Sequence, residues 1–364
     1  MTVPGLRLAM IVRDEAPIMQ RAIASILPLI DSWRIIDTGS TDDTVELIES
    51  SLEGVAGEMR RSTWVDFGHN RSELVDWAAE GADWLLLLDA DMIVHADDDL
   101  AEQLAAFSAD AALVPVDGGV SYRMPYLVRG NRPWHYVGRT HEHLSSTAPY
   151  RTEWFDGLRI THVADGSSHQ VKLERDAALL GLDLIEHPDS SRTVFYLAQT
   201  YRDAGEHELA LQQYRRRASM GGWAEEVFWS LYQAALIEEA IASPTATDAM
   251  IRAWDARPER AEPLYRLARR HRLLRQHHAA WIFASAAAAL ELPDDTLFVD
   301  GEVYRWAAAF ERADAAWRIG HRALARTEVE RLLALDGIPA EHRDHLELMR
   351  SDLGASENLR SHPA

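Results

Sequence analysis

Short apolar runs alternate with amphipathic stretches from the start of the chain to about residue 165. Continuous apolar runs at Leu6–Val12, Trp33–Asp37 and Trp84–Leu88 predict strands. Between them, apolar residues recur at helical spacing over 17–29 and 70–80, which predicts helices there. Strands that alternate with helices in this way favour a mainly parallel sheet with helices on both faces. We therefore predict an α/β domain in this part of the chain.

Beyond that point the strand-like runs give way to helical segments rich in Ala, Leu, Arg and Glu. Residues 194–214 carry large and small apolar side chains at the spacing of a tetratricopeptide helix pair, and residues 264–287 repeat that spacing. The offset, 264 − 194 = 70 residues, is about two repeats of ~34 residues, so a degenerate unit is expected over 229–258. Any Ala/Leu-rich helical stretch gives a few such matches, but two copies that share five spaced positions favour a helical solenoid.

These patterns place the α/β domain at 1–168 and a tetratricopeptide-like all-α domain at 171–340. The stretch Asp165–Gln170 is predicted to be a short linker, and residues 354–364 are predicted to form a disordered tail. The expected fold class is therefore an α/β domain followed by an all-α domain of helical repeats.

The amino-acid composition argues against some classes of binding partner and bears on the cellular compartment. The 364 residues include 37 Lys+Arg and 58 Asp+Glu, a formal net charge of −21, which argues against nucleic acid and anionic membranes as main partners. There is no cysteine, which excludes disulfides and thiolate metal sites and fits a cytoplasmic protein. The apolar run near the N-terminus leads directly into charged residues, so it is interpreted as a strand rather than a signal peptide. No run approaches the ~18 apolar residues of a membrane span.

Two carboxylates interrupt the most apolar strand, in the sequence WLLLLDADMIV at 84–94. Burying carboxylates costs free energy unless a cation meets them. In an extended chain Asp89 and Asp91 face the same side, where a divalent metal is the common reason to hold two such groups. Polar residues also follow the other predicted strands, at 13–15 and at Asp37. Because the carboxyl ends of parallel strands meet at one edge, these residues are expected to share a crevice.

Three interpretations of Asp-Ala-Asp compete. A helix-capping role suits the later aspartates at 97–99 but not Asp89, which ends the strand well before them. A phosphatase of the haloacid dehalogenase type has Asp-x-Asp after its first strand, whereas this pair follows the third or fourth. A nucleotide-sugar transferase has Asp-x-Asp in mid-domain, where it holds a divalent ion against the diphosphate. The short motif alone does not decide among them.

Four stretches occur together in the order and spacing of a known family: LAMIVRDEAP at the start, IIDTGSTDDT at 35–44, WLLLLDADM at 84–92 and YVGRTHEHL at 136–144. On these motifs the chain resembles the inverting family-2 glycosyltransferases of GT-A fold. It looks closest to the bacterial subgroup in which tetratricopeptide repeats follow the catalytic domain. The resemblance covers residues 5–165 and extends through FYLAQTYRDAGEHELALQQY at 195–214.

The resemblance assigns roles to individual residues. The expected nucleotide-sugar-binding residues are Val12, Arg13, Glu15, Asp37, Arg71, Asp89 and Ala90. In this set Asp37 matches the residue that accepts a hydrogen bond from the base, and Asp89 matches the ribose-side acid. Asp91 and His162 match the ligands of a Mg²⁺ or Mn²⁺ ion, and Glu142 matches the catalytic base.

Some positions depart from the family pattern or have a plainer interpretation. The family usually has Ala-Arg-Asn where this chain has His69-Asn70-Arg71, so the base contact expected of Arg71 depends on its register. It often has Glu where this chain has Met92, which removes one carboxylate near the metal. From the residues alone, Glu142 also fits an exposed strand-end charge, and a histidine such as His162 is more often solvated than a ligand.

The resemblance implies a metal-dependent, inverting transfer of a sugar from a nucleoside-diphosphate sugar, most simply a uridine-linked one, to a peptide, protein or glycan acceptor. In such a transfer a carboxylate takes the acceptor's proton while the metal stabilises the leaving diphosphate. The alternative is a catalytically inactive, transferase-like scaffold that displays its repeats to a protein partner. Intact carboxylates and histidine at the expected site positions favour the enzyme.

The helical repeats offer a concave face that is expected either to select the acceptor or to pair two copies of the chain. Trp306, Phe310 and Trp317 are large apolar residues near the end of the repeats. They fit a contact in a homodimer or simple packing between the last helices. The sugar and the glycosylated atom of the acceptor are not specified by the sequence.

Overall fold

The computed structural model describes residues 2–117, 122–163, 169–295 and 297–358. The chain divides into two compact units, Met1–Pro188 and Asp189–Ala364, and each is described here by itself. Most of the predicted linker, residues 165–168, and the end of the predicted tail, residues 359–364, lie outside the described residues.

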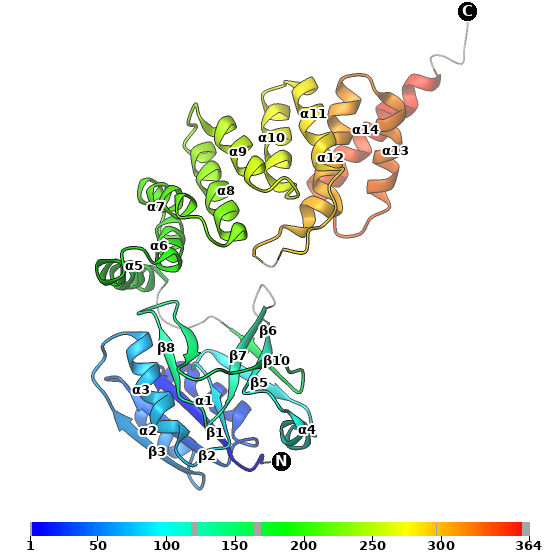
Figure 1. Ribbon diagram of the computed structural model, residues 1–364. Coiled ribbons are helices and arrows are strands. Elements are labelled where there is room, and N and C mark those ends of the chain that lie inside the picture. Colours follow the sequence, from blue (N-terminus) through cyan, green and yellow to red (C-terminus); the bar gives the residue numbers. More distant parts are fainter. Residues whose placement is uncertain (1, 118–121, 164–168, 296, 359–364) are drawn as a thin grey trace, which may run out of the picture. The chain divides into compact units, whose positions relative to one another are not determined.

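The first unit is built on a large curled sheet with the strand order β3-β2-β1-β4-β7-β6-β11-β5, and β10 pairs with β6 (Figure 1). Pairing is parallel from β3 to β4 and between β6 and β11, and it is antiparallel where β7 and β5 join. The strands are β1 (Leu6–Val12), β2 (Ser32–Asp37), β3 (Ala56–Arg61), β4 (Trp84–Leu87), β5 (Met92–Ala96), β6 (Ala111–Asp117), β7 (Tyr122–Arg129), β10 (Thr152–Trp154) and β11 (Leu158–His162). A separate ribbon joins β8 (Trp134–Val137) to β9 (His143–Ser146).

Helices cover both faces of this sheet. They are α1 (Ala16–Ile26), α2 (Thr44–Ser51), α3 (Phe67–Ala79) and α4 (Leu100–Ala106). The last helix of this unit, α5 (His169–Glu186), contacts Arg139 and Thr140. Alternate residues of the strands enter two cores, because side chains in a strand point to opposite faces in turn. Leu8 and Leu86 pack in the core that contains α1 and α4, whereas Ala9 and Leu85 pack in the core that contains α3. This arrangement confirms the predicted α/β domain.

Only β1, β2 and β4 were predicted as individual strands, so the other strands have no counterpart among the predicted elements. The edge strand β3 is one of them. Its residues are almost all exposed and its sequence, AGEMRR, has no apolar run, so the apolar pattern gives no signal for it. It pairs with β2 at the edge of the sheet, where Gly57 lies under the ring of Trp33. A Cβ atom at Gly57 would lie 2.3 Å from that ring, so only glycine fits.

The second unit is all-α, and its helices pack mainly against their neighbours along the chain (Figure 1). They are α6 (Ser191–Asp203), α7 (His207–Ser219), α8 (Ala224–Ala240), α9 (Ala246–Ala256), α10 (Glu262–Leu273), α11 (His277–Ala287), η1 (Val303–Ala307), α12 (Ala308–Arg318), α13 (Arg322–Leu333) and α14 (Ala340–Asn358). Ala198, Ala210, Ala268 and Ala280 are fully buried, as expected where paired helices approach closely. The predicted tetratricopeptide-like repeats are confirmed, and α8 and α9 form the expected intermediate unit.

The turns inside the helix pairs share one geometry. After α6, α8, α10 and α12, one residue adopts a left-handed conformation: Gly205 (φ 79°), Ala242 (φ 53°), Arg275 (φ 57°) and Gly320 (φ 84°). The next amide then donates a 2.8 Å hydrogen bond back to a carbonyl in the last turn of the helix. Such left-handed caps are usually glycine, because a side chain there costs steric energy.

The large apolar residues near the end of the repeats belong to a core. Trp306 and Phe310 are 6% and 4% exposed and pack with residues of α13 and α14. Trp317 is partly buried against the same cluster and donates a hydrogen bond from its indole to Asp352. Packing therefore accounts for these three side chains. Within the described ranges, no helix has the length and apolar character needed to cross a membrane.

Candidate active site

The ends of β1 and β2 meet at one level of the sheet, where Val12 is paired with Asp37. The Val12 carbonyl accepts hydrogen bonds from the amide and the hydroxyl of Thr38, at 3.0 and 3.1 Å. Asp37 is 1% exposed, and its Oδ1 accepts a 2.9 Å hydrogen bond from the Ser40 amide. Its Oδ2 is buried and has no hydrogen-bond partner among the described residues. One buried acceptor is therefore available at this strand end.

The two loops that follow β1 and β2 are held together by side-chain contacts. Asp14 adopts φ 53° and accepts hydrogen bonds from the Thr41 amide (2.7 Å) and hydroxyl (3.1 Å). The Glu15 amide donates to the Thr44 hydroxyl at 2.8 Å. Arg13 is exposed and lies 3.7 Å from Asp14. The predicted nucleotide-binding residues of the first loop are thus fixed beside the loop that begins with Asp37.

The loop from β4 to β5 carries Asp89, Ala90 and Asp91. Met92 begins β5 and pairs with His162, the last residue of β11. This register brings Nε2 of His162 to 3.0 Å from Oδ2 of Asp91, although 71 residues separate them. Met92 itself is 3% exposed and lies in the core, so it occupies an apolar position. The two residues that the sequence assigns to a metal therefore lie together.

Arg71 of α3 links the strand-end acids to the loop of Glu142. Its guanidinium NH2 lies 2.6 and 2.8 Å from the two oxygens of Asp89. Its Nε lies 2.9 Å from Oε1 of Glu142, and its guanidinium also lies over the ring of Tyr136. The guanidinium is thus paired with two carboxylates of the site. The base contact expected of Arg71 stays a prediction.

Glu142 is largely buried, with a side chain that is 12% exposed. Burial raises the pKa of its carboxyl above the usual value, and the charge of Arg71 opposes this shift. A carboxylate with a raised pKa is a better proton acceptor once it is ionised. The plainer interpretation of Glu142, an exposed charge at a strand end, is not what the structure has.

Close approach of two backbones positions the loop before Glu142. Gly138 adopts φ 100°, and its carbonyl lies so near Gly68 that a Cβ atom there would be 2.0 Å away. The Arg139 carbonyl accepts a 3.0 Å hydrogen bond from the Phe67 amide at the start of α3. Asp66, the N-cap of α3, accepts hydrogen bonds from the His69 amide (2.7 Å) and from Arg139 (3.1 Å). The start of α3 and the loop of Glu142 are therefore one packed assembly.

Helix α5 holds the other side of this loop. The Thr140 hydroxyl donates a 3.3 Å hydrogen bond to Asp176, and both residues are buried. The Arg139 guanidinium lies 2.6 Å from Glu186 near the end of α5. The negative charge of Asp176 also raises the pKa of Glu142, as a smaller contribution than burial. Sequence reasoning missed Asp176, because α5 lies beyond the recognised motifs and its amphipathic pattern looks like that of any helix in the repeats.

The site as a whole has an excess of acid. Burial first, and then the negative charges of Asp91 and Asp89, raise the pKa of Glu15 to about 7. Glu15, which follows β1, is therefore close enough to Asp89 and Asp91, which follow β4, for their charges to affect it. This is expected for acids at the ends of neighbouring parallel strands. In the parts of the chain that the structure describes, no group of three or more His, Cys, Asp or Glu residues has the arrangement of a metal site. A metal there would have to take ligands from a bound substrate as well.

The structure does not support the capping interpretation of Asp-Ala-Asp, and it places Trp134 in the interior. Helix α4 begins at Leu100 with Asp99 at its N-cap, so Asp89 and Asp91 do not cap it. Trp134 is 4% exposed and donates a 2.7 Å hydrogen bond from its indole to the Arg129 carbonyl. It is therefore a packing residue and does not project toward a ligand.

Comparison with known proteins agrees with the geometry. Residues 8–164 match the family model described as Glycosyl transferase family 2. The α/β domain belongs to glycosyltransferase family 2. This match also decides against the phosphatase interpretation of Asp-Ala-Asp, since that motif lies in the middle of the matched region.

Individual relatives share only part of their length with this chain. A TPR repeat-containing protein of Synechococcus elongatus is 32% identical over 142 residues, which cover 35% of this chain and 34% of that protein. The SPbeta prophage-derived glycosyltransferase SunS of Bacillus subtilis is 25% identical over 118 residues, 31% of this chain and 27% of SunS. The chain thus spans about a third or less of the length of these curated relatives. A solved structure of S. aureus TarS covers 66% of this chain and 53% of TarS at 12% identity, and its TM-score of 0.37 supports no conclusion about this chain.

Proposed function

We propose that the chain is a metal-dependent, inverting glycosyltransferase that moves a sugar from a uridine-diphosphate sugar to a peptide, protein or glycan acceptor. The observation that carries the proposal is the pair Asp91 and His162, 3.0 Å apart, next to the Asp89–Arg71–Glu142 cluster. Such a transfer needs groups that bind the metal, here a carboxylate–imidazole pair, and a separate carboxylate that takes the acceptor's proton.

The donor nucleotide is proposed to bind along the loops after β1 and β2. Oδ2 of Asp37 accepts no hydrogen bond among the described residues and lies 3.8 Å from Nε of Arg61, so it suits an N–H donor such as the imide of uracil. A base that left this buried oxygen without a donor would lose affinity. Val12, Arg13 and Glu15 line the path from there toward Asp89 and Ala90, where the ribose is proposed to lie.

The donor set at Asp91 and His162 fits Mn²⁺ or Mg²⁺. Oδ2 of Asp91 and Nε2 of His162, 3.0 Å apart, are a carboxylate oxygen and an imidazole nitrogen that could both bind one such ion. Magnesium and manganese commonly take one or two protein ligands and complete their shell with substrate phosphates. Such an ion supplies positive charge to the leaving diphosphate. It would also offset the repulsion that raises the pKa of Glu15.

Glu142 is proposed to be the catalytic base. In one displacement the acceptor nucleophile bonds to the anomeric carbon, the bond from that carbon to the diphosphate oxygen breaks, and Glu142 takes the nucleophile's proton. Its ion pair with Arg71, made through Oε1, keeps the carboxylate oriented, and in the proposal the other oxygen faces the acceptor. Arg71 in turn ties this base to Asp89 of the donor site.

Release of nucleoside diphosphate from a panel of sugar nucleotides with Mn²⁺ tests the proposal, followed by mass spectrometry of candidate acceptors. Turnover of one sugar nucleotide, abolished by EDTA, is the expected result. The rival proposal is an inactive scaffold that binds a protein through its repeats. Binding of a partner with no release of diphosphate from any donor would favour that scaffold. The repeats are proposed to select the acceptor or to pair two copies of the chain.

A further inference from the structure

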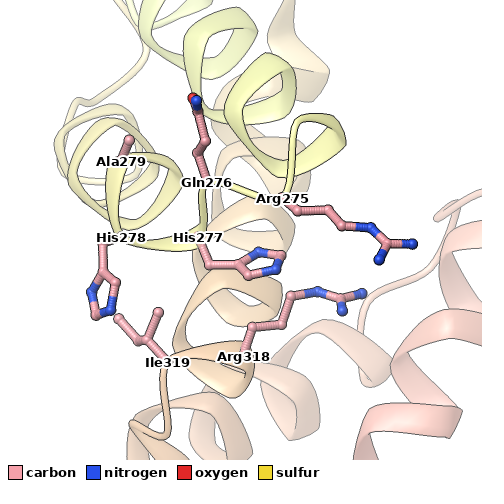
Figure 2. Close-up of a pocket in the computed structure, with 7 residues that line it drawn as sticks. All are labelled: Arg275, Gln276, His277, His278, Ala279, Arg318 and Ile319. Carbon is pink, nitrogen blue, oxygen red and sulfur yellow. The ribbon is translucent and has the colours of Figure 1, made fainter.

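The helical unit contains a small cavity lined by basic side chains. Its volume is about 290 Å³, and it lies between the α10–α11 turn and the end of α12. Its lining residues are Arg275, Gln276, His277, His278, Ala279, Arg318 and Ile319, so none of the described residues that line it is acidic. Figure 2 shows that Arg275, His277 and Arg318 extend in the same direction from two different segments. In a chain of net charge −21, this is a local concentration of positive charge.

The arginine at the turn is the most informative of these residues. Arg275 occupies the left-handed position (φ 57°) that is Gly205 and Gly320 in two equivalent turns of the repeats. A long side chain at this position costs steric energy that glycine avoids. Arg275 has no ion pair among the described residues, so no internal salt bridge accounts for the choice of arginine. Its side chain lines the cavity instead.

The second arginine, Arg318, is held in place by a buried carboxylate and an aromatic ring. Nε of Arg318 donates a 2.9 Å hydrogen bond to Asp314, which is 0% exposed, and the guanidinium lies 5.0 Å from the ring of Trp317. Asp314 also binds His345 at 2.7 Å, so its charge is shared. This contact uses Nε of Arg318 rather than its two amino groups, and Arg318 lines the cavity. An arginine fixed by a buried carboxylate loses little conformational freedom when it binds a ligand.

A third residue of the cavity, His277, has a ring nitrogen without a hydrogen-bond partner among the described residues. Nδ1 of His277 is buried and has no hydrogen bond in the part of the chain that the structure describes. A larger cavity nearby, of about 500 Å³, provides a contrast. Two of its arginines, Arg266 and Arg272, are already bound by Glu239 and Glu311. Of these two cavities, the smaller one is lined by a guanidinium without an ion pair, that of Arg275, and by no acid among the residues that the structure describes.

We propose that the cavity formed by Arg275, His277 and Arg318 is an oxyanion-binding site that takes the phosphate or carboxylate group of a ligand. Guanidinium groups bind both kinds of oxyanion through paired N–H donors. The volume accommodates one such group together with the atoms attached to it. The site is separate from the family 2 domain and does not depend on its proposed activity.

Calorimetric titration of the full chain with inorganic phosphate tests this proposal. Arg275→Gly removes the guanidinium and restores the residue that fits the turn, so its melting temperature should equal or exceed that of the native chain. Its affinity for phosphate should fall about tenfold, the usual effect of losing one charge-assisted hydrogen bond. Arg318→Lys should show a similar loss, because it keeps the charge beside Asp314 but removes the fork. Arg270→Gln, on α10 outside the cavity, is the matched control and should bind phosphate as the native chain does.

Competing anions identify the ligand class. Methyl phosphate that displaces phosphate more strongly than acetate does assigns the site to phosphate groups, and the reverse order assigns it to carboxylates. Either order supports an oxyanion site. Equal affinity of the native chain and Arg275→Gly for phosphate would overturn the proposal, since phosphate would then bind elsewhere. Equal competition by chloride would also overturn it, because simple screening needs no built site.

Discussion

Charged side chains are buried in both units, but they are balanced differently. In the helical unit, Arg260 is 0% exposed and lies between Glu262 and Asp295. A hydrogen bond from Arg257, aided by Arg260, lowers the pKa of Asp295. In the family 2 domain, burial and neighbouring carboxylates raise the pKa of Glu15 to about 7, and burial raises the pKa of Glu142.

The difference separates structural charges from candidate functional ones. A buried acid that is fully paired stays ionised and holds segments together, as Asp295 holds the chain before η1. An acid kept near other acids is unfavourable in the folded protein unless a ligand relieves it, which is typical of active sites. Glu311 is an intermediate case, because burial raises its pKa although Arg272 binds it. The contrast is therefore one of local charge balance rather than of burial alone.

The largest effect is expected from Glu142→Gln. The amide keeps the size and the contact with Arg71 but cannot take a proton, so turnover should fall by ~10²–10⁴ with little change in the affinity for the donor. Steady-state kinetics measures turnover, and calorimetry measures the affinity for the donor. The matched control is Glu226→Gln, a buried and paired acid of the helical unit, which should leave turnover almost unchanged. A loss of donor affinity at constant turnover would make Glu142 a binding residue.

Asp91→Asn should come next. It removes one negative ligand from the pair with His162, so turnover should fall by ~10² and the response to Mn²⁺ should weaken. Titration of activity with Mn²⁺, with the circular dichroism spectrum as a check on folding, measures both. Full activity of the native chain in EDTA would exclude the proposed metal role.

Arg260→Met tests the other side of the comparison. It leaves Glu262 and Asp295 buried without their shared partner, so the helical unit should lose ~3–5 kcal/mol of stability. Donor binding by the family 2 domain should persist. Urea denaturation followed by helical signal, together with calorimetry of donor binding, provides the two readouts. A parallel loss of donor binding under native conditions would show that the balance of charge in one unit supports the other.

The smallest effect is expected from Asp176→Asn, and it concerns pH. Ionised Glu142 is the active form of a base, so kcat/KM should rise with pH through the pKa of Glu142. The negative charge of Asp176 helps to raise that pKa, so its removal should lower the pKa and move the acid limb of the profile to lower pH. A uniform decrease at every pH would indicate a loss of structure instead. Glu186→Gln, which contacts Arg139 and not Thr140, serves as the control.

The apolar pattern was sufficient for β1, β2 and β4 and for the helix pairs, because these strands are buried on both faces and the repeats need small residues at fixed positions. It gave no individual prediction for the later strands β5 to β11 or for β3, whose residues face solvent. Strand order and register cannot be read from such a pattern. The contact of His162 with Asp91 depends on the antiparallel pairing of β11 with β5, and only the family resemblance connected the two residues in advance.

Arg71 shows the limit of motif transfer. Its identity and approximate place were predicted, but its contacts follow from where α3 packs beside β4 and the β8–β9 loop. A shift of one residue along the helix would rotate the side chain by about 100° and break both ion pairs. The identity of Asp176 as a neighbour of the Glu142 loop had no sequence signal at all.

The contacts of helix α5 limit where this domain could be joined to the repeats of another protein. The family match ends at residue 164, yet the compact unit continues to Pro188. A fragment that stops at 168 would retain every matched motif but lose the partners of Thr140 and Arg139. A fragment that stops at Pro188 would retain them. A recombination event that joined this domain to other repeats would therefore have to carry α5 along, so the natural junction lies after the helix and not at the end of the recognisable family sequence.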